Sequence, residues 1–559
     1  MKSWALLVPS AAPEDAIRSM PEITFRWFQK IISTAFLCSA VVVLVGGCTS
    51  TSVEREPDWI HVRLKKNPNT LDPARIVDLD SARIAAKLFN GLVGFDAQLQ
   101  PVGDLARSWT LSADGRIYCF DLRDDVLFSN GRLVTAHDVI FSFERVLAPQ
   151  TRSPRTWVLS RIQGADVFMQ GRLDRVTGLR ALGLHRLEIT LSEPFAPFLS
   201  MLGLTTAYVV PREEVERLGD EFGRQASGSG PFMLVEWKHN QQVRLRKNPN
   251  WRGPGPLSSG ICYRIIPEDF TAMVAFEKGS LDILPEIMSS EFVRYTRDPQ
   301  WRDFVQQATG LNTYYLGLNC RREPFNDVRV RQALNYAIDR PTMLAAILDG
   351  RGEVARGPVP PLLRRGSAPP GYGYDPQRAR RLLVEAGYPD GFSMQIYQTA
   401  DTENLDMCQA VQAYLQAVGI QVSIVQLEWS TFLAAVADGE ADAFWLSWWA
   451  DYPDAENFLY PLFHSANLGA GGNRSQYVDA RFDSLIEQAV TTPDSQQRDT
   501  LYAQCEKLIV AQAPWVFFWH KQACSIHRPE IRGYQAVALP VMEKGISWQR
   551  RVGTGNDRG

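Results

Sequence analysis

The chain has 559 residues, of which 45% are hydrophobic, 22% charged and 11% aromatic, and these values exclude a disordered, collagen-like or low-complexity chain. Its 59 basic and 62 acidic side chains give a net charge of −3, too balanced for a protein held on nucleic acid by phosphate charge. Only one apolar run approaches the length of a membrane span, which excludes a multi-span transporter. What remains is a large globular protein of roughly three domains at about 150 residues each.

The start of the chain differs in composition from the rest. The apolar run 31–47 follows two basic residues and precedes a polar stretch. This order is typical of a secretory signal, and the run is shorter than the about 20 residues of a membrane-spanning helix. Residues 45–48 resemble a bacterial lipoprotein box, in which Cys48 becomes the first mature residue and bears lipid. We therefore expect a signal peptide over 1–47 and a tether over 48–58; the alternative is an uncleaved anchor with an incidental cysteine.

Beyond the tether, strand and helix signals are mixed. Residues 117–128 alternate between apolar and polar side chains, and the pair 130–131 (Asn-Gly) is a tight-turn signal. Thr135 and Asp138 have the spacing of a capping box, which predicts a helix that ends before Pro149.

Two further helices are predicted later in the chain. One follows residues 326–327 (Asn-Asp) and has apolar side chains at helical spacing, at Val330, Leu334, Ala337 and Ile338. The other starts with Asp375 as N-cap and Pro376 in the first turn, and it stops at Gly387. Between them, the segment 357–374 is rich in proline and glycine, which predicts a loop.

One local pattern occurs twice, at 276–283 and at 436–443. In each, a helix end is followed by a glycine cap and by a short strand entered through an aspartate. The pattern predicts two α/β lobes with similar local structure rather than an array of repeats.

No catalytic or metal-binding motif is present. The seven histidines lack HExxH or HxH spacing, and the sequence has no GxSxG or GxxxxGK[ST] motif. His137, beside Asp138, is expected to serve a helix start rather than catalysis. The cysteines that follow Cys48 form no CxxC pair, which argues against zinc and thioredoxin-like sites. Most are expected to be buried single thiols, with a Cys505–Cys524 disulfide as the alternative.

The segment 444–458 concentrates aromatic residues, with Trp445, Trp448 and Trp449 in five positions. Neighbouring residues of a strand face opposite sides, so one of Trp448 and Trp449 is expected to line a cavity while the other packs. Asp451, just beyond the strand, could hold a cation. The alternative is a core strand whose aspartate caps the next turn.

Several segments in order along residues 57–525 together resemble one family. They are 71–73 with 88–92, 106–109, 128–131, 135–139, 228–232, 248–251, 325–334 with 337–340, 383–388 and 448–452. The family that they resemble is the family 5 extracellular solute-binding proteins, which serve ABC importers of oligopeptides and dipeptides.

The resemblance implies an α/β fold of the periplasmic-binding-protein type II-like class. It has two mixed-sheet lobes, an extra domain and a ligand cleft between the lobes. Lobe I would comprise 55–90, 214–309 and 526–559, the extra domain packed on it 91–213, and lobe II 310–525. Ligand binding would shift an open–closed equilibrium, and the importer would recognise the closed form.

The resemblance also implies roles for particular residues. Asp451 would anchor the ammonium group of a peptide through a charge-assisted hydrogen bond. The peptide main chain would pair as an added strand between two segments. These are Val77, Asp78 and Leu79 on one side and Ser447, Trp448 and Trp449 on the other. Trp429 and Trp448 match positions that wall side-chain pockets.

The chain also departs from the family pattern. Glu403 and Trp445 match positions that are basic in oligopeptide binders and meet the peptide carboxylate. An acidic contact matching Val77 is lost, although Asp78 lies next to it. Asn312 and Trp449 match a cysteine pair found in some relatives. The amine end of a ligand is therefore better supported than its carboxylate end.

These inferences predict a monomeric periplasmic lipoprotein, held on the cell membrane by Cys48, without enzymatic activity, cofactor, metal or nucleic acid. It would capture a peptide or similar amine-bearing solute and deliver it to the permease subunits of an ABC importer. Two alternatives remain: the same fold binding a metal chelate, haem, a saccharide or a signalling peptide, and a secreted hydrolase.

Overall fold

The computed structural model describes residues 56 and 58–551. The chain divides into two compact units, Met1–Pro57 and Asp58–Gly559. The first unit lies almost entirely outside the described residues, as do the predicted signal peptide 1–47, Cys48 and nearly all of the tether. Within the described residues, no helix is both long and apolar enough to cross a membrane.

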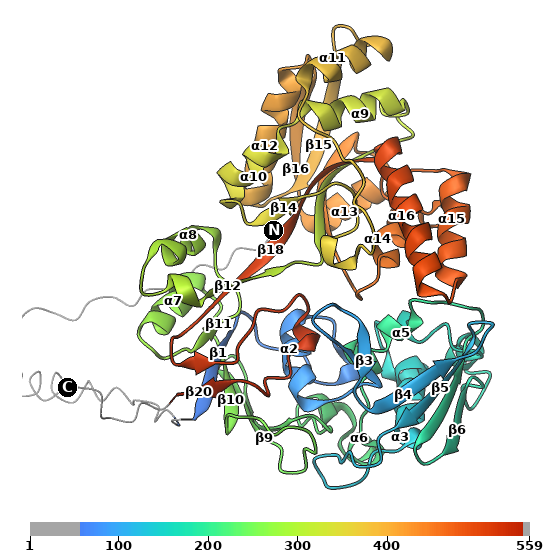
Figure 1. Ribbon diagram of the computed structural model, residues 1–559, viewed down its shortest axis with the longest axis vertical. Helices are drawn as coiled ribbons and strands as arrows, with labels where there is room; N and C mark the ends of the chain where they lie inside the picture. Colours follow the sequence, from blue (N-terminus) through green and yellow to red (C-terminus); the bar gives the residue numbers. More distant parts are fainter. Residues whose placement is uncertain (1–55, 57, 552–559) are drawn as a thin grey trace, which may run out of the picture. The chain divides into compact units, whose positions relative to one another are not determined.

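One 12-stranded mixed sheet forms the centre of the second unit (Figure 1). Its first group of strands, called here the β1 half, comprises β1 (Trp59–Leu64), β8 (Phe232–Lys238), β9 (Gln242–Lys247), β10 (Gly260–Ile265), β11 (Ile283–Leu284) and β12 (Val305–Thr309). The second group, called the β13 half, comprises β13 (Asn312–Leu318), β14 (Gly352–Val354), β15 (Ser393–Thr399), β16 (Gln421–Leu427) and β17 (Ala443–Trp449). β1 runs parallel to β10, and β15 parallel to β16, whereas β13 pairs antiparallel to β17.

A single long strand, β18 (Trp515–His527), belongs to both halves. Its first part pairs with β13 and β14, and its second part with β12 and β11 (Figure 1). At the change of partner, the Asn312 side chain donates to the Lys521 carbonyl at 2.9 Å and accepts from the Lys521 N–H at 2.8 Å. Gly310 lies against this bracket, because a Cβ there would meet Asn312 Nδ2 at 2.1 Å. A buried side-chain amide thus replaces a backbone partner between the two halves.

A separate four-stranded antiparallel sheet has the order β4 (Ala106–Leu111), β5 (Ile117–Leu122), β7 (Arg186–Thr190) and β6 (Leu179–Gly183). β2 (Val93–Phe95) and β3 (Pro101–Gly103) form a two-stranded sheet, as do β19 (Ile531–Arg532) and β20 (Gln549–Arg550). β5 ends earlier than the alternating pattern predicted, since residues 123–125 are exposed and charged. The predicted turn is present, with Gly131 at φ 89°.

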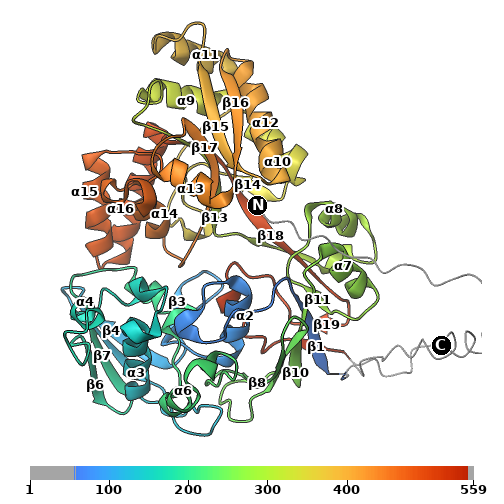
Figure 2. The same ribbon diagram turned by 180° about the vertical axis from the view of Figure 1, so that it is seen from behind.

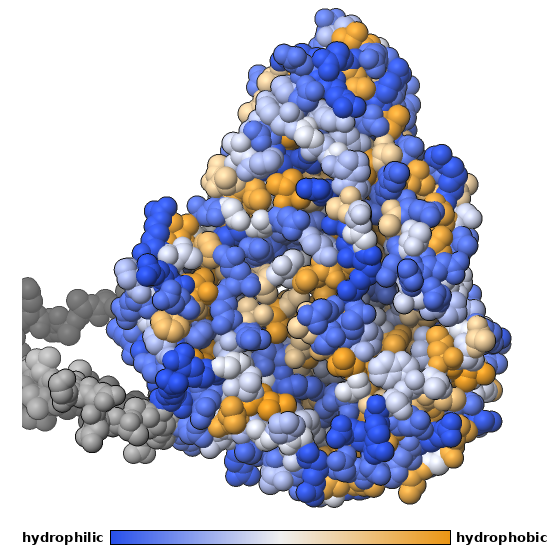
Figure 3. Space-filling view, in the orientation of Figure 1, coloured by the Kyte–Doolittle hydropathy of each residue, from blue (hydrophilic) through white to orange (hydrophobic). Residues whose placement is uncertain are grey.

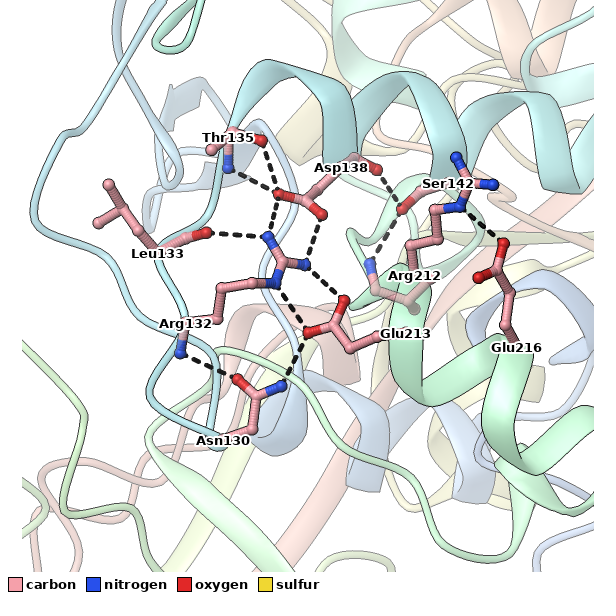
Figure 4. A network of polar contacts seen from close by, with 10 residues as sticks. Asn130, Arg132, Leu133, Thr135, Asp138, Ser142, Arg212, Glu213 and Glu216 are labelled. Carbon is pink, nitrogen blue, oxygen red and sulfur yellow. Dashed lines mark hydrogen bonds and ion pairs between the residues drawn. The ribbon is translucent and has the colours of Figure 1, made fainter.

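The predicted helix is α3 (Ala136–Leu147), and its start is the centre of a polar network (Figure 4). The Thr135 N–H and hydroxyl donate to the Asp138 carboxylate at 2.9 and 2.8 Å. Arg132 donates to both oxygens of Asp138 and, through Nε, to Glu213 at 2.7 Å. Thr135 and Asp138 are therefore the capping residues, and His137 is exposed between them.

The other predicted helices and the repeated pattern are confirmed. α9 (Val328–Ala337) and α11 (Pro376–Glu385) start at the expected aspartate caps. Gly279 (φ 79°) follows α7 (Asp269–Glu277), and Gly439 (φ 74°) follows α13 (Trp429–Ala437). Asp282, which enters β11, accepts the backbone N–H of His61, and Asp442, which enters β17, accepts that of Gln395. The remaining helices of the described part are α2 (Leu79–Leu88), α4 (Ala165–Met169), α5 (Phe198–Met201), α6 (Arg212–Leu218), α7 (Asp269–Glu277), α8 (Ser289–Arg297), α10 (Arg340–Leu348), α12 (Thr402–Gln416), α13 (Trp429–Ala437), α14 (Glu456–Phe463), α15 (Ala480–Thr491) and α16 (Ser495–Gln512).

Several hydrophobic cores support this arrangement. α9, α10 and α12 pack with β15 and β18 in one cluster, and both ribbon views place these helices around the β15–β16 end of the sheet (Figure 2). A second cluster extends from the β4–β7 sheet to α14, α15 and α16. The six described cysteines are free, so the alternative Cys505–Cys524 disulfide is wrong; the two thiols lie in different hydrophobic clusters.

Candidate functional site

The turn after β17 has the geometry that the sequence predicted. Trp448 and Trp449 are the last residues of β17, and Asp451 lies just beyond them. Trp448 is half-buried against the larger core, whereas Trp449 is 50% exposed. The two tryptophans therefore divide into one that packs and one that faces outward.

The side chain of Asn457, near the start of α14, fixes this turn through two hydrogen bonds. Its Oδ1 accepts the backbone N–H of Asp451 at 2.9 Å and the indole N–H of Trp448 at 3.3 Å. The carboxylate that serves the start of α14 is Asp454, which accepts the Glu456 N–H at 2.9 Å. Asp451 is thus held by its backbone, and its carboxylate is not the one that caps the helix.

The Asp451 carboxylate instead contacts an arginine from the β4–β7 part of the chain. Arg155 Nη1 lies 3.5 Å from Asp451 Oδ1, and the two side chains are 27% and 38% exposed. The ring of Trp157 packs on that of Tyr452 with centroids 5.9 Å apart. Burial raises the pKa of Asp451, while Arg155 and Asn457 act in the opposite direction.

Two more carboxyl groups lie beneath the turn. Burial raises the pKa of Asp454, and it raises the pKa of Glu456 to about 8. The Tyr452 hydroxyl donates to Glu456. Three carboxyl groups with raised pKa thus lie within six residues, and burial favours the protonated, neutral form of each.

Glu403, which departs from the basic residue of the family pattern, is paired with a lysine. Lys521 Nζ of β18 lies 2.6 Å from Glu403 Oε1 and 5.8 Å from the ring centre of Tyr314. Tyr314 lies opposite Ser447 in the β13–β17 register, and Asn312 lies opposite Trp449. A basic group is therefore present beside Glu403, on a strand that sequence spacing did not connect with it.

The other two predicted aromatic residues have different environments. Trp445 is 3% exposed, donates its indole N–H to Asn404 at 3.1 Å and packs on Phe518, so it is a core residue in this structure. Trp429 is 53% exposed at the first turn of α13 and stacks on Phe432.

The opposite predicted segment is the entry to α2. Asp78 is its N-cap, accepting the Ser81 N–H at 2.8 Å and the Ser81 hydroxyl at 2.7 Å. Val77 and Leu79, on either side, are 51% and 64% exposed. The carboxylate of Asp78 serves the helix, while the apolar side chains beside it face solvent.

Four of the predicted site residues, Val77, Leu79, Trp429 and Trp449, are large apolar side chains that are half or more exposed. Hydrophobic side chains also interrupt the polar surface around the hollowed middle of one face (Figure 3). Among residues 56 and 58–551, no group of three or more histidine, cysteine or acidic side chains could hold a metal ion.

The mixed sheet has the fold of periplasmic solute-binding proteins. The family model for bacterial extracellular solute-binding proteins, family 5 middle, matches residues 100–470. The chain therefore belongs to this family, as the resemblance of its motifs indicated, and the periplasmic-binding-protein fold is confirmed.

Individual relatives cover nearly the whole chain. Heme-binding protein A of Haemophilus influenzae is 28% identical, over 90% of this chain and 96% of its own. Di/tripeptide-binding protein 2 of Pseudomonas aeruginosa is 29% identical, over 88% and 95%. Among solved structures, the unliganded open form of the periplasmic murein tripeptide binding protein MppA is 25% identical, has a TM-score of 0.79, and matches 89% of this chain and 98% of that one.

Proposed function

We propose that this protein captures small peptides with a free amino terminus in a cleft between two lobes and delivers them to the permease subunits of an ABC importer. The observation that supports this most directly is Asp451. Its backbone is fixed by Asn457, while its carboxylate is 38% exposed and meets Arg155 at 3.5 Å. A relative named for di- and tripeptides is 29% identical over 88% of this chain.

The cleft would use the segments that the sequence singled out. Val77, Asp78 and Leu79 would pair with one edge of the peptide, and Ser447, Trp448 and Trp449 with the other. Such main-chain pairing gives affinity without selecting side chains. Trp429 and Trp448 would wall pockets, and Glu403 with Trp445 would lie toward the ligand's other end.

The proposed division of the chain follows the family. Lobe I comprises 55–90, 214–309 and 526–559, the extra domain 91–213, and lobe II 310–525. Cys48 would bear the lipid that holds the protein, as a monomer, on the periplasmic side of the cell membrane. Cys48→Ala should release the protein from the membrane fraction, and the mass of its amino-terminal peptide should lack the acyl groups.

The test of the amine anchor is isothermal calorimetry with tri-alanine and N-acetyl-tri-alanine. Asp451→Asn should weaken binding of the free-amine peptide by about 1.5–3 kcal/mol, because a hydrogen bond to a charged group is lost. N-acetylation should cause a comparable loss in the wild type. Asp390→Asn, at an exposed aspartate beyond α11, is the control and should change neither value. If both losses are absent, Asp451 has only a structural role.

A second candidate is haem, since the relative from Haemophilus influenzae is named for haem binding. Absorbance titration with haemin distinguishes the two, because only a bound haem shifts its main absorption band. Mass spectrometry of tri-alanine recovered after incubation tests the hydrolase alternative, since a binding protein returns the peptide intact.

A further inference from the structure

The segment that holds Arg155 lies directly against the turn that holds Asp451. The two segments are far apart in the sequence, yet the Arg155 guanidinium lies 3.5 Å from the Asp451 carboxylate. The neighbouring Trp157 ring packs on Tyr452, the residue after Asp451, and the Arg155 N–H donates to Ser153 Oγ at 3.3 Å. These two contacts place the Arg155 side chain beside the Asp451 carboxylate.

This ion pair has the features of a contact that can exchange. The distance is long, and both side chains are partly exposed. By contrast, Arg132 meets Asp138 through two nitrogens at 2.7 and 3.0 Å. Partly exposed pairs contribute little to stability, about 0.2–1 kcal/mol. Another cation can therefore replace Arg155 at low cost.

A ligand ammonium at Asp451 would meet the guanidinium already there. Two cations within a few ångström of each other repel, so a ligand ammonium at Asp451 gains less from the carboxylate while Arg155 stays paired with it. A ligand without an amine leaves the Arg155–Asp451 pair intact and gains nothing from Asp451.

We propose that Arg155 competes with the ligand ammonium for the carboxylate of Asp451. This competition lowers the affinity of the protein for amine-bearing peptides and sets how strongly such a peptide must bind in order to replace Arg155. This inference rests on the proposed peptide-binding function. Arg155 is thereby a specificity-determining residue: the net gain from an amine is the difference between two cations at one carboxylate.

The test is calorimetry with tri-alanine and N-acetyl-tri-alanine on the full chain. Arg155→Gln should tighten tri-alanine binding about two- to fivefold, the range that corresponds to the loss of a partly exposed ion pair. It should leave N-acetyl-tri-alanine unchanged, and Arg155→Lys should return affinity toward the wild type. Arg152→Gln, at an exposed arginine of the same segment, should have no effect.

A double-mutant cycle gives the decisive result. In the Asp451→Asn background, Arg155→Gln should no longer tighten binding, because the competition needs the carboxylate. If Arg155→Gln weakens or does not change tri-alanine binding while the wild type binds it, the competitor role is wrong and the proposed function stands. If neither protein binds tri-alanine or any peptide of a mixed tripeptide pool, the proposed function fails and the competitor role fails with it.

Discussion

Two acidic regions of this protein shift the pKa values of their carboxyl groups in opposite directions. In the network at the start of α3, Arg132 bonds to both Asp138 and Glu213, and this hydrogen bonding lowers the pKa of Glu213 to about 2. In the turn after β17, burial raises the pKa of Asp451 and Asp454 and raises that of Glu456 to about 8. In the first region an arginine holds the Glu213 carboxylate in its charged form, whereas in the second burial favours the protonated form.

The largest expected effect is on the pH dependence of stability at Glu456. Its pKa rises from an ordinary 4.5 in the unfolded chain to about 8 when folded. The folded state therefore holds the proton more tightly, and stability falls as pH rises from about 4.5 through about 8. Glu456→Gln should abolish this loss, which is on the order of 4 kcal/mol by pH 9. Urea unfolding at pH 5 and pH 9 measures it.

Glu213→Gln is the control with the opposite sign. The lowered pKa of Glu213 contributes stability above its unfolded value, and this stability is lost as pH falls toward about 2. The variant should therefore be less stable than the wild type at pH 7, with a difference that closes in acid. Equal pH profiles for both variants and the wild type would contradict the contrast between the two regions.

The next effect concerns the network itself. Asp138→Ala removes the cap of α3 and leaves Arg132 with half of its partners, so the free energy of unfolding should fall by about 3 kcal/mol. Asp121→Ala, which breaks the exposed Arg186–Asp121 pair, should cost less than about 0.5 kcal/mol. Urea titration of both variants gives the comparison, and similar losses would show that the network has no special role.

A smaller effect is expected at Asn457, beneath the turn. Asn457→Ala leaves the Asp451 N–H and the Trp448 indole N–H without their acceptor, which should cost about 2 kcal/mol of stability and reduce the preference for free-amine over acetylated tri-alanine. Asn404→Ala removes the equivalent acceptor of Trp445 and should leave that preference intact. Calorimetry with both peptides separates the two, and an unchanged preference in Asn457→Ala would mean that Asp451 is positioned by other contacts.

The smallest stability change is expected at Trp449, beside the same turn. Because Trp449 is 50% exposed, Trp449→Ala should change the unfolding free energy by no more than about 0.5 kcal/mol while weakening tri-alanine binding severalfold. Trp448→Ala, on the packed side, should cost clearly more stability. The reverse order of stability would mean that the outward side chain is the structural one.

The sequence predicted features that depend on neighbouring residues. Thr135 with Asp138, Asp327 and Asp375 were identified as helix starts because capping acts within one turn of chain. The position of Asp451 beyond β17 followed from alternation along one strand.

Contacts between distant segments were not predictable in this way. Arg155 has no motif around it, and Lys521 lies in an aromatic strand far from Glu403. Their meeting depends on how β18 and the loops of the β4–β7 part are brought together, which residue spacing does not encode. Trp445 packs on Phe518 and donates its indole N–H to Asn404, two contacts that the strand pattern did not predict.

The bracket that Asn312 makes across the change of partner in β18 has a mechanical consequence. Because one unbroken strand enters both halves of the sheet, a rocking of one half would twist the backbone around Asn312 and Lys521. A side chain at position 310 would clash with that of Asn312, so only glycine fits there. A substitution at this point would change the torsional stiffness between the β1 half and the β13 half without contacting a ligand. It would therefore change how often the two halves close, and not which ligand they bind.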